Sequence, residues 1–317
     1  MKTYEMSDEE KEFLAGYDLT KYDRPSVAAD VVVFSVMKDD ECEDVRRLQE
    51  KKLKILLIRR GGFPYKGSWA MPGGFCRKGE DVIDSARREL CEETGIDDAY
   101  VKLVGVYGEP DRDPRGWVIS STYMALMNGR DCRLKAGDDA QDARWFTVEL
   151  TDISTEVTEA AEVSGTGEEI VKNEVEASCK VQNEKRYRLV LKDADSDIKL
   201  TAVLRRTDMS SCGRSSDSYD IEECEGLAFD HARIITEAVL GLREDVRRDM
   251  ELAFDLLPER FTLTELQNVY EQIWDMELTT PNFRRKIAEY VEETDAYQSG
   301  ERYRPAKLFM RRKDARK

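Results

Sequence analysis

Histidine is nearly absent from this sequence. The one histidine among 317 residues, His231, lies beside Asp230 in the run "AFDHAR", and we interpret it as a residue at the start of a helix. Catalysis by histidine is therefore not expected. The seven cysteines form no C-x-x-C pair and are odd in number, which argues against a disulfide framework and against a zinc site. We expect reduced thiols.

Long apolar runs are also missing. No segment is long enough to span a membrane, and the opening run "MKTYEMSDEEKEF" lacks the basic start and apolar middle of a signal peptide. With 40% hydrophobic and 37% charged residues, the composition is that of a globular protein, and the length suffices for two or three domains. We expect a cytoplasmic protein with no membrane partner.

Positive charge is in short supply over most of the chain. The formal net charge of −16 argues against a globally basic nucleic-acid binder. The run from Arg302 to Lys317, "RYRPAKLFMRRKDARK", is the exception, because it holds eight Lys or Arg against one Asp. One end of an acidic chain therefore carries a positive field of its own.

Regular structure is indicated by several local patterns. Ser7 and Glu10 form a capping box that opens a short helix. The β-branched or apolar runs "SVAADVVVFSV" and "KKLKILLIRR" predict two strands joined by a polar hairpin loop over residues 38–50. Further strand candidates are "AYVKLVGVYGEP", "WVISSTYMALM" and "ARWFTV".

Strands that flank one helix indicate a compact α+β domain. Beyond it, the composition becomes acidic and rich in small residues, with one predicted hairpin in "KRYRLVLKDADSDIKLTAVLRR", before apolar residues return at helical spacing. We divide the chain into an N-terminal helical arm, the α+β domain, an insertion or linker with a hairpin, bridging helices and a C-terminal domain: residues 1–23, 24–150, 151–226, 227–257 and 258–317.

One acidic stretch, "GGFCRKGEDVIDSARRELCEETGI", raises a question of stability, because like charges one helical turn apart repel each other. Residues 82–94 favour a helix that Gly95 ends, so Glu89 and Glu93 share a face. Their oxygens would converge on a hard cation such as Mg²⁺, which relieves the repulsion. The alternative is an ordinary solvated helix face, but that does not account for the glycines at both ends.

The spacing of this stretch is G-x5-E-x7-R-E-U-x-E-E-x-G-U, where U is an aliphatic residue. It resembles the Nudix box, and the α+β domain resembles the Nudix hydrolase family. The resemblance implies Mg²⁺ or Mn²⁺ as cofactor and hydrolysis of a nucleoside diphosphate linked to another group. It assigns cation ligation to Gly74, Glu89, Glu92 and Glu93, and a catalytic part to Glu92, Glu93 and Arg88.

Two other acidic positions belong to the same hypothesis. Glu80 precedes the helix and either braces the loop or holds a metal-bound water. A general base is not defined by the box. "KAGDDAQDARWF" offers Asp138, Asp139 and Asp142, of which we favour Asp139, with turn-forming aspartates as the alternative.

The segments on either side of the box, "RRGGFPYKGSWAMPGG" and "YGEPDRDPRGWVIS", resemble those of ADP-ribose pyrophosphatases and of Nudix-related transcriptional regulators of NAD metabolism. Arginines would reach phosphates and aromatic rings would stack on adenine, although aromatic residues beside strands commonly belong to the core. The loop "DRDPRG" would close over the ribose phosphate. The substrate-binding candidates are Arg59, Arg60, Phe63, Trp69, Glu80, Asp111, Arg112 and Arg115, with Tyr65 and Trp117 as further rings.

The C-terminal domain has the pattern of a winged helix-turn-helix. Thr262 and Glu265 form a capping box for one helix, and Thr280 as N-cap with Pro281 opens a second helix. "YQSGERYRPAKLFMRRK" would form a two-stranded wing, as in the regulators that this domain resembles. The candidates for DNA contact are Arg284, Arg285, Lys286, Arg302, Arg304 and Lys307. A helical packing or dimerisation domain with a solvated basic tail is the alternative.

The expected fold class is thus α+β, with a Nudix α/β/α sandwich on a mixed sheet followed by a winged helix-turn-helix domain. Two functions remain open. One is a metal-dependent pyrophosphohydrolase that cleaves ADP-ribose or a related nucleoside diphosphate sugar. The other is a homodimeric repressor that senses such a nucleotide and binds double-stranded DNA. Both activities are compatible with an intact box.

Overall fold

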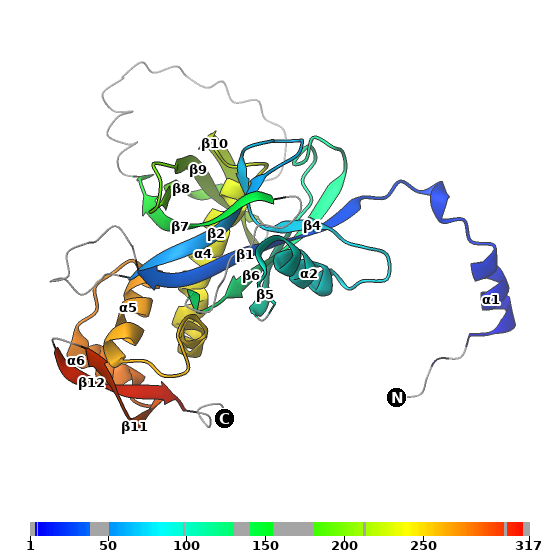
Figure 1. Ribbon diagram of the computed structural model, residues 1–317. Coiled ribbons are helices and arrows are strands. Elements are labelled where there is room, and N and C mark those ends of the chain that lie inside the picture. The colour runs from blue at the N-terminus through cyan, green and yellow to red at the C-terminus, as the bar shows by residue number, and fades with distance from the viewer. Residues whose placement is uncertain are drawn as a thin grey trace, which may run out of the picture.

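The computed structural model describes residues 4, 6–38, 51–97, 99–129, 140–154, 180–211, 214–300 and 303–312 (Figure 1). A single large mixed sheet dominates it, with the strand order β10-β9-β8-β7-β2-β1-β6-β5, and with the short strands β3 on β2 and β4 on β1. β1 pairs in parallel with β6 and antiparallel with β2. The strands are β1 Ser26–Lys38, β2 Lys51–Arg60, β3 Trp69–Ala70, β4 Gly73–Phe75, β5 Tyr100–Tyr107, β6 Val118–Leu126, β7 Ala140–Asp152, β8 Lys180–Asp193, β9 Lys199–Ser211 and β10 Arg214–Glu225.

Helices cover both faces of this sheet. Because side chains alternate along a strand, Val31 and Val33 of β1 pack under α2, whereas Val32 and Phe34 pack under α4. The predicted α/β/α sandwich with a mixed sheet is therefore confirmed. The helical elements are α1 Asp8–Ala15, η1 Leu19–Lys21, α2 Val82–Thr94, α4 His231–Arg248, η3 Met250–Leu256, α5 Leu263–Trp274 and α6 Thr280–Ile287.

The segment expected to be an insertion or linker, 151–226, is largely part of the sheet. The predicted hairpin is confirmed, because β8 and β9 pair antiparallel from Lys192↔Lys199 outward. The polar run after this hairpin extends β9 and forms β10, which the sequence patterns did not predict. Cross-strand ion pairs, such as Arg206 with Asp217 at 2.7 Å, compensate for its polar composition. The boundary expected at Leu150 falls inside β7.

The C-terminal domain has the expected elements with shifted ends. α5 and α6 are followed by an antiparallel wing, β11 Val291–Gly300 and β12 Tyr303–Arg311. The predicted N-cap is wrong by one residue, because Thr279 is the extended residue and Thr280 already belongs to α6. The second helix ends at Ile287, and the pairing of Val291 with Arg311 takes the following residues into the wing.

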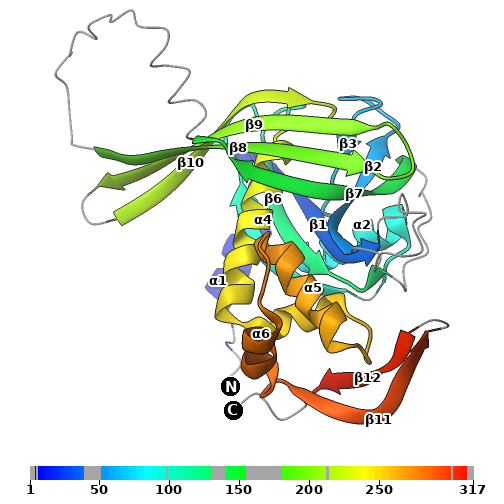
Figure 2. The same cartoon turned by 90° about the vertical axis from the view of Figure 1, so that its left-hand side faces the viewer.

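The winged-helix domain shares one hydrophobic core with the sheet. The bridging segment expected at 227–257 contains α4 and η3, and their buried residues join the sheet to α5 and α6 in a single cluster. Figure 2 shows α4 running from the sheet toward α5 and α6. A half-buried ion pair of 3.2 Å joins Lys51 of β2 to Glu265 of α5. Among the described residues, no helix is long and apolar enough to cross a membrane.

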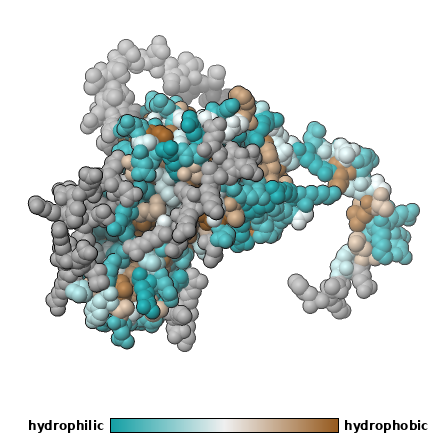
Figure 3. Space-filling view, in the orientation of Figure 1, coloured by the Kyte–Doolittle hydropathy of each residue, from teal (hydrophilic) through white to brown (hydrophobic). Residues whose placement is uncertain are grey.

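The N-terminal arm contrasts with this packing. The capping box of Ser7 and Glu10 is confirmed, but no residue of α1 is buried, and the helix lies away from the sheet in Figure 1. Figure 3 shows some hydrophobic surface on this arm. The side chains of Phe13, Leu14 and Tyr17 are exposed. The chain thus contains two capping boxes in opposite environments, one buried at α5 and one exposed at α1.

We expect Thr262→Ala to lower the free energy of unfolding by about 1 kcal/mol, because the hydroxyl that accepts from the Glu265 N–H at 3.1 Å is lost from a helix in the core. Urea unfolding followed by circular dichroism measures this change. Ser7→Ala removes the same type of bond from α1 and should leave the main transition where it is. Equal effects of the two substitutions would contradict the described packing.

Candidate functional site

Helix α2 carries the acidic motif, and both of its predicted ends are confirmed. Asp81 is the N-cap and accepts from the backbone N–H of Ile83. Gly95 adopts a left-handed conformation with φ of 79° and donates to the Cys91 carbonyl, which ends the helix. Ala86 and Leu90 are buried against the sheet. This packing turns the face with Glu89 and Glu93 toward β4.

The two glycines before the helix are required by close approach. A Cβ on Gly74 would lie 2.5 Å from the Glu89 carboxylate, and a Cβ on Gly73 would lie 2.3 Å from Oδ1 of Asp30. The Gly73 N–H donates to Oε2 of Glu93 at 2.8 Å. The glycine turn therefore lies directly against the carboxylates of Glu89 and Glu93 on α2, as the motif spacing indicated. A side chain at either glycine would push the turn away from its neighbours.

Arg88 is the hub of the charged network. Its Nε and Nη2 donate to the two Glu80 oxygens at 2.7 and 3.1 Å, while Nη1 donates to Glu89 at 2.6 Å and to Glu92 at 3.0 Å. The hydrogen bonds from Arg88, and next the one from Ser85, lower the pKa of Glu80 to about 2. Glu80 also accepts from the backbone N–H of Arg77 at 3.1 Å. Of its two expected roles, this geometry corresponds to the brace.

Three acids, Glu93, Glu89 and Asp30, lie close to one another, and nearby positive charge compensates them only in part. Burial, followed by the charges of Glu89 and Asp30, raises the pKa of Glu93 to about 8 against the opposing effect of the Gly73 N–H. Asp30 was missed from the sequence, although one acid inside the run "SVAADVVVFSV" was the available signal. Ser120 donates a hydrogen bond to Asp30. A divalent cation near these acids would favour their ionised forms.

Glu92 points elsewhere in this structure. Its carboxylate is half exposed and accepts from Arg77 at 3.2 Å as well as from Arg88. Within the described ranges, no three acidic, histidine or cysteine side chains gather as a ready-made cation site. A full set of motif ligands would therefore require Glu92 to leave Arg77.

A small cavity of about 70 Å³ adjoins the glycine turn. It is much smaller than the several hundred Å³ typical of nucleotide or drug-sized ligands. An occupant of that size would have to displace some of the lining groups. They include Asp30, Arg60, Gly73, Gly74, Phe75, Arg112, Asp113, Arg115, Phe229 and His231.

The structure brings together only part of the expected substrate-binding set. Arg60, Arg112 and Arg115 line the cavity. Arg60 donates to the Pro64 carbonyl at 2.8 Å and lies 4.9 Å from the centre of the Phe229 ring. The chemistry of this lining, three guanidinium groups beside an aromatic ring, suits an anion joined to a flat ring.

Other expected positions lie outside the cavity lining. The expectation that Trp69 binds substrate must be corrected. Trp69 is 4% exposed and packs edge-on against Phe146 in the core, so its ring is not available to a base. Phe63 is 84% exposed, and Arg59 donates to the Gly67 carbonyl at 3.1 Å. Asp111 is exposed, with a positive φ of 63°. Asp139, Asp138 and Arg302 lie outside the described residues.

The start of α4 completes the cavity, and no local pattern in the sequence assigned it to this site. Asp230 accepts from Nε and Nη2 of Arg112 at 2.9 and 2.7 Å, and the Phe229 ring lies 4.7 Å from the Tyr65 ring, tilted by 58°. The interpretation of His231 as a helix-start residue is confirmed. Its Nδ1 accepts from the Met71 N–H at 3.0 Å, and burial lowers its pKa to about 4. His231 is therefore a neutral acceptor that joins α4 to the turn before the glycines.

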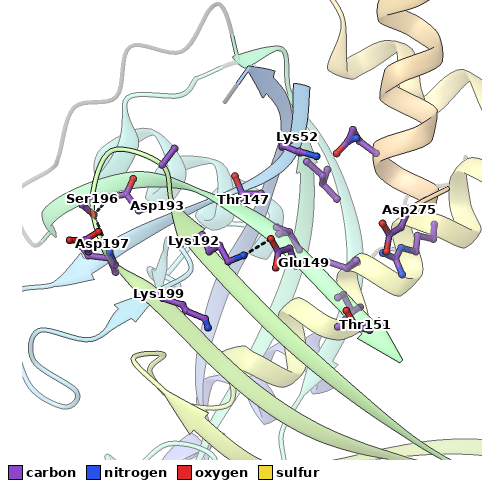
Figure 4. A pocket seen from close by; sticks show the side chains of 18 residues that line it. Lys52, Thr147, Glu149, Thr151, Lys192, Asp193, Ser196, Asp197, Lys199 and Asp275 are labelled. Atoms are coloured by element: carbon purple, nitrogen blue, oxygen red, sulfur yellow. Dashed lines mark hydrogen bonds and ion pairs between the residues drawn. The ribbon is translucent and has the colours of Figure 1, made fainter. Parts of the chain in front are cut away.

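A wider cavity of about 620 Å³ lies away from the acidic motif, between β7, the β8–β9 turn and the ends of α4 and α5 (Figure 4). Its acids and bases largely neutralise each other. Lys192 pairs with Glu149 at 2.7 Å, and Arg243 lies 3.5 Å from Asp275. Nothing in this lining selects a ligand of one charge.

The basic residues expected to contact DNA differ in how far other side chains already engage their charges. Arg284 is exposed on α6 and forms no ion pair within the described part of the chain, and Arg285 makes a 3.4 Å contact with Asn282. Lys286 lies 5.6 Å from the centre of the Trp274 ring, and Lys307 of the wing pairs with Glu293. The Arg304 side chain is outside the described atoms. Arg284 and Arg285 are therefore the two most available cations of this set.

The comparisons with known proteins agree with this division. The family model of the NUDIX domain matches residues 44–164, and that of the NrtR DNA-binding winged helix domain matches residues 253–310. The ADP-ribose pyrophosphatase of Methanocaldococcus jannaschii is 42% identical over 139 residues, which cover 43% of this chain and 72% of that protein. The ADPR responsive transcriptional repressor NtrR of Acinetobacter baylyi is 29% identical over 304 residues, 95% of this chain and 87% of that protein.

Solved structures extend the likeness to the whole fold. A MutT/nudix family protein from Enterococcus faecalis is 25% identical and covers 98% of this chain and all of its own, with a TM-score of 0.59. NrtR of Shewanella oneidensis in complex with a 27mer DNA is 23% identical and covers 91% of this chain and 94% of its own, with a TM-score of 0.54. At that identity, the second likeness establishes the fold alone.

We expect stability to depend on pH through His231. Its folded pKa, about 4, is below its ordinary value of 6.5, so the unfolded chain binds the proton more readily. The free energy of unfolding should therefore fall as pH drops from 6.5 to 4, by up to ~3 kcal/mol from this residue, and show no contribution from it above pH 7. His231→Asn offers an acceptor that does not titrate. The difference between wild type and variant, measured by urea unfolding at several pH values, should shrink toward pH 4; a constant difference would contradict the assignment.

Proposed function

Because the chain belongs to the Nudix hydrolase family and carries an NrtR-type winged-helix domain, we propose that it is an ADP-ribose-responsive transcriptional repressor. The Nudix pocket would bind ADP-ribose, and the winged-helix domain would bind double-stranded DNA. The observation that carries this proposal is the likeness to the Acinetobacter repressor along 95% of the chain, across both domains and the helix between them. The shared core of α4, α5 and the sheet gives the two domains a physical connection.

The lining of the small cavity supports a sugar nucleotide as ligand. Arg60, Arg112 and Arg115 supply charge for a diphosphate, and Phe229, whose ring contacts that of Tyr65, supplies aromatic surface for a ring. The sequence-based candidates Arg59, Phe63 and Asp111 remain proposals for a pocket that opens further. A related sugar nucleotide would satisfy the same contacts.

We also propose that the box retains pyrophosphohydrolase activity. The residues fit a divalent cation, because Glu89 and Glu93 face Asp30 without full compensation and because Gly74 leaves room for a carboxylate where a Cβ would intrude. Mg²⁺ or Mn²⁺ held by Glu89, Glu92, Glu93 and the Gly74 carbonyl would neutralise the diphosphate and activate a water. Arg88 orients Glu89 and Glu92, and Glu80 fixes Arg88. Asp139 remains our candidate for the general base.

DNA binding is proposed to use α6 and the wing as a homodimer. Two copies related by a twofold axis would place their α6 helices in successive major grooves of a palindromic site. Arg284 and Arg285 would reach the DNA from α6, and Lys307, Arg302 and Arg304 would meet phosphates from the wing. We propose a cytoplasmic location, which suits a role on DNA.

For the enzymatic proposal, Glu93→Gln should lower the release of AMP from ADP-ribose in Mg²⁺ by at least about 100-fold, because a neutral amide cannot compensate a cation. Chromatography of the products measures the rate. Asp84→Asn lies on the exposed side of the same helix and should retain wild-type turnover. Wild-type protein that turns over no nucleoside diphosphate derivative would reject catalysis and leave the sensing proposal standing.

For the DNA-binding proposal, Arg284→Ala should weaken binding to a palindromic operator about 10-fold and reduce the salt dependence by roughly one counterion. Fluorescence anisotropy at several salt concentrations measures both. Arg247→Ala removes an exposed arginine at the far end of α4 and serves as the control. An operator affinity that is unchanged in Arg284→Ala would exclude α6 as the contact surface.

A further inference from the structure

The loop after β5 is tied to the first turns of α4 by three successive side-chain contacts. Tyr107 donates to Glu237 at 2.9 Å, and Arg233 donates to Glu109 at 2.7 Å. Arg112 donates twice to Asp230, at 2.9 and 2.7 Å. Positions 230, 233 and 237 share one face of a helix, so the loop lies along that face. Any movement of this loop therefore changes its contacts with α4.

Asp230 occupies an unusual position in this contact. It is the N-cap residue of an 18-residue helix, yet its side chain makes no cap hydrogen bond. An aspartate at this position commonly accepts from the second or third N–H of its helix. Here each of its oxygens accepts from Arg112 instead, and the pair is nearly buried, with side-chain exposures of 6% for the arginine and 14% for the aspartate. Arg112 thus holds Asp230 away from the helix that it would otherwise cap.

Arg112 is also a wall of the proposed ligand pocket. The cavity of about 70 Å³ is too small for a dinucleotide, so an occupant must displace lining groups. A diphosphate competes directly with a carboxylate for a guanidinium group, since both are bidentate acceptors. The bonds to Asp230 use Nε and Nη2, which leaves Nη1 as the first point of attachment for an entering phosphate.

The other end of α4 reaches the winged-helix domain. Arg243 donates from Nε to the Ile273 carbonyl at 3.1 Å, at the end of α5. Val239, Leu242 and Val246 are buried in the cluster that contains α5 and α6. A close-packed helix of this kind moves as a body rather than bending at one residue. A change at Asp230 is thereby connected to α5 by continuous packing.

We propose that the Arg112–Asp230 pair couples the ligand pocket to the DNA-binding domain, an inference that rests on the proposed function. In the ligand-free protein, Asp230 positions Arg112 at the pocket wall. A bound diphosphate takes Arg112, and Asp230 then caps α4, which shifts that helix against α5. The state with the capped helix binds ADP-ribose more tightly and DNA more weakly.

The test uses Asp230→Ser in the full-length protein, because serine caps a helix but forms no ion pair with Arg112. ADP-ribose affinity is measured by calorimetry, and operator affinity by anisotropy with and without ADP-ribose. We expect tighter ADP-ribose binding and weaker DNA binding without ligand, each by on the order of 10-fold, and a smaller effect of ligand on DNA than in wild type. A variant that is merely destabilised would lose both affinities rather than gain one.

Two controls keep the outcomes separate. Asp230→Asn, which also caps and preserves the side-chain volume, replaces the serine variant if that protein does not fold. Glu244→Ser removes an exposed ion pair with Arg247 on the same helix and should behave as wild type. Wild-type coupling in both Asp230 variants would overturn this inference alone. Wild-type protein that ignores ADP-ribose would overturn the proposed function, and the inference with it.

Discussion

Electrostatic repulsion between acids is the constraint around which the Nudix site is built. Glu89, Glu93 and Asp30 interact where α2, β1 and β4 meet, and burial, followed by the charges of Glu89 and Asp30, raises the pKa of Glu93. Arg88 neutralises one side of the group through its hydrogen bond to Glu89, and the Gly73 N–H reaches Glu93 on the other. A divalent cation bound beside these acids would compensate their remaining negative charge.

The same site is closed by a helix from outside the motif. Phe229 and His231 come from the segment that leads to the winged-helix domain, yet they line the cavity beside the glycine turn, and Asp230 between them accepts from Arg112 of the same lining. Since α4 also contributes to the core under α5, the pocket and the DNA-binding elements share one rigid part. This arrangement gives the proposed nucleotide pocket a direct physical connection to the winged-helix domain.

Sequence patterns predicted those features of the fold that depend on residues close together in the chain. The end of α2 follows from Gly95, the capping boxes from Ser7 and Thr262, and the sandwich from alternating apolar runs. The motif spacing also placed Arg88 against its glutamates. These features depend on residues a few positions apart, where periodicity and capping are informative.

Features that depend on tertiary contact were not accessible in this way. Asp230 and His231 join the site from more than 130 residues beyond the box, and Trp69 belongs to the core because Phe146 of a distant strand covers it. The polar run after β9 forms a strand because an existing sheet edge and cross-strand ion pairs stabilise it. Thr279 rather than Thr280 is the N-cap of α6. Both residues are threonine, so only the backbone conformation distinguishes them.

The most direct test of the whole account is competition on DNA. Wild-type protein bound to a fluorescent palindromic operator is titrated with ADP-ribose and, separately, with an equimolar mixture of AMP and ribose 5-phosphate. The account predicts that intact ADP-ribose releases the DNA and that its two hydrolysis products do not, because only a joined diphosphate engages the arginines and the aromatic wall together. Release by the products at the same concentration, or no release by either, would contradict it.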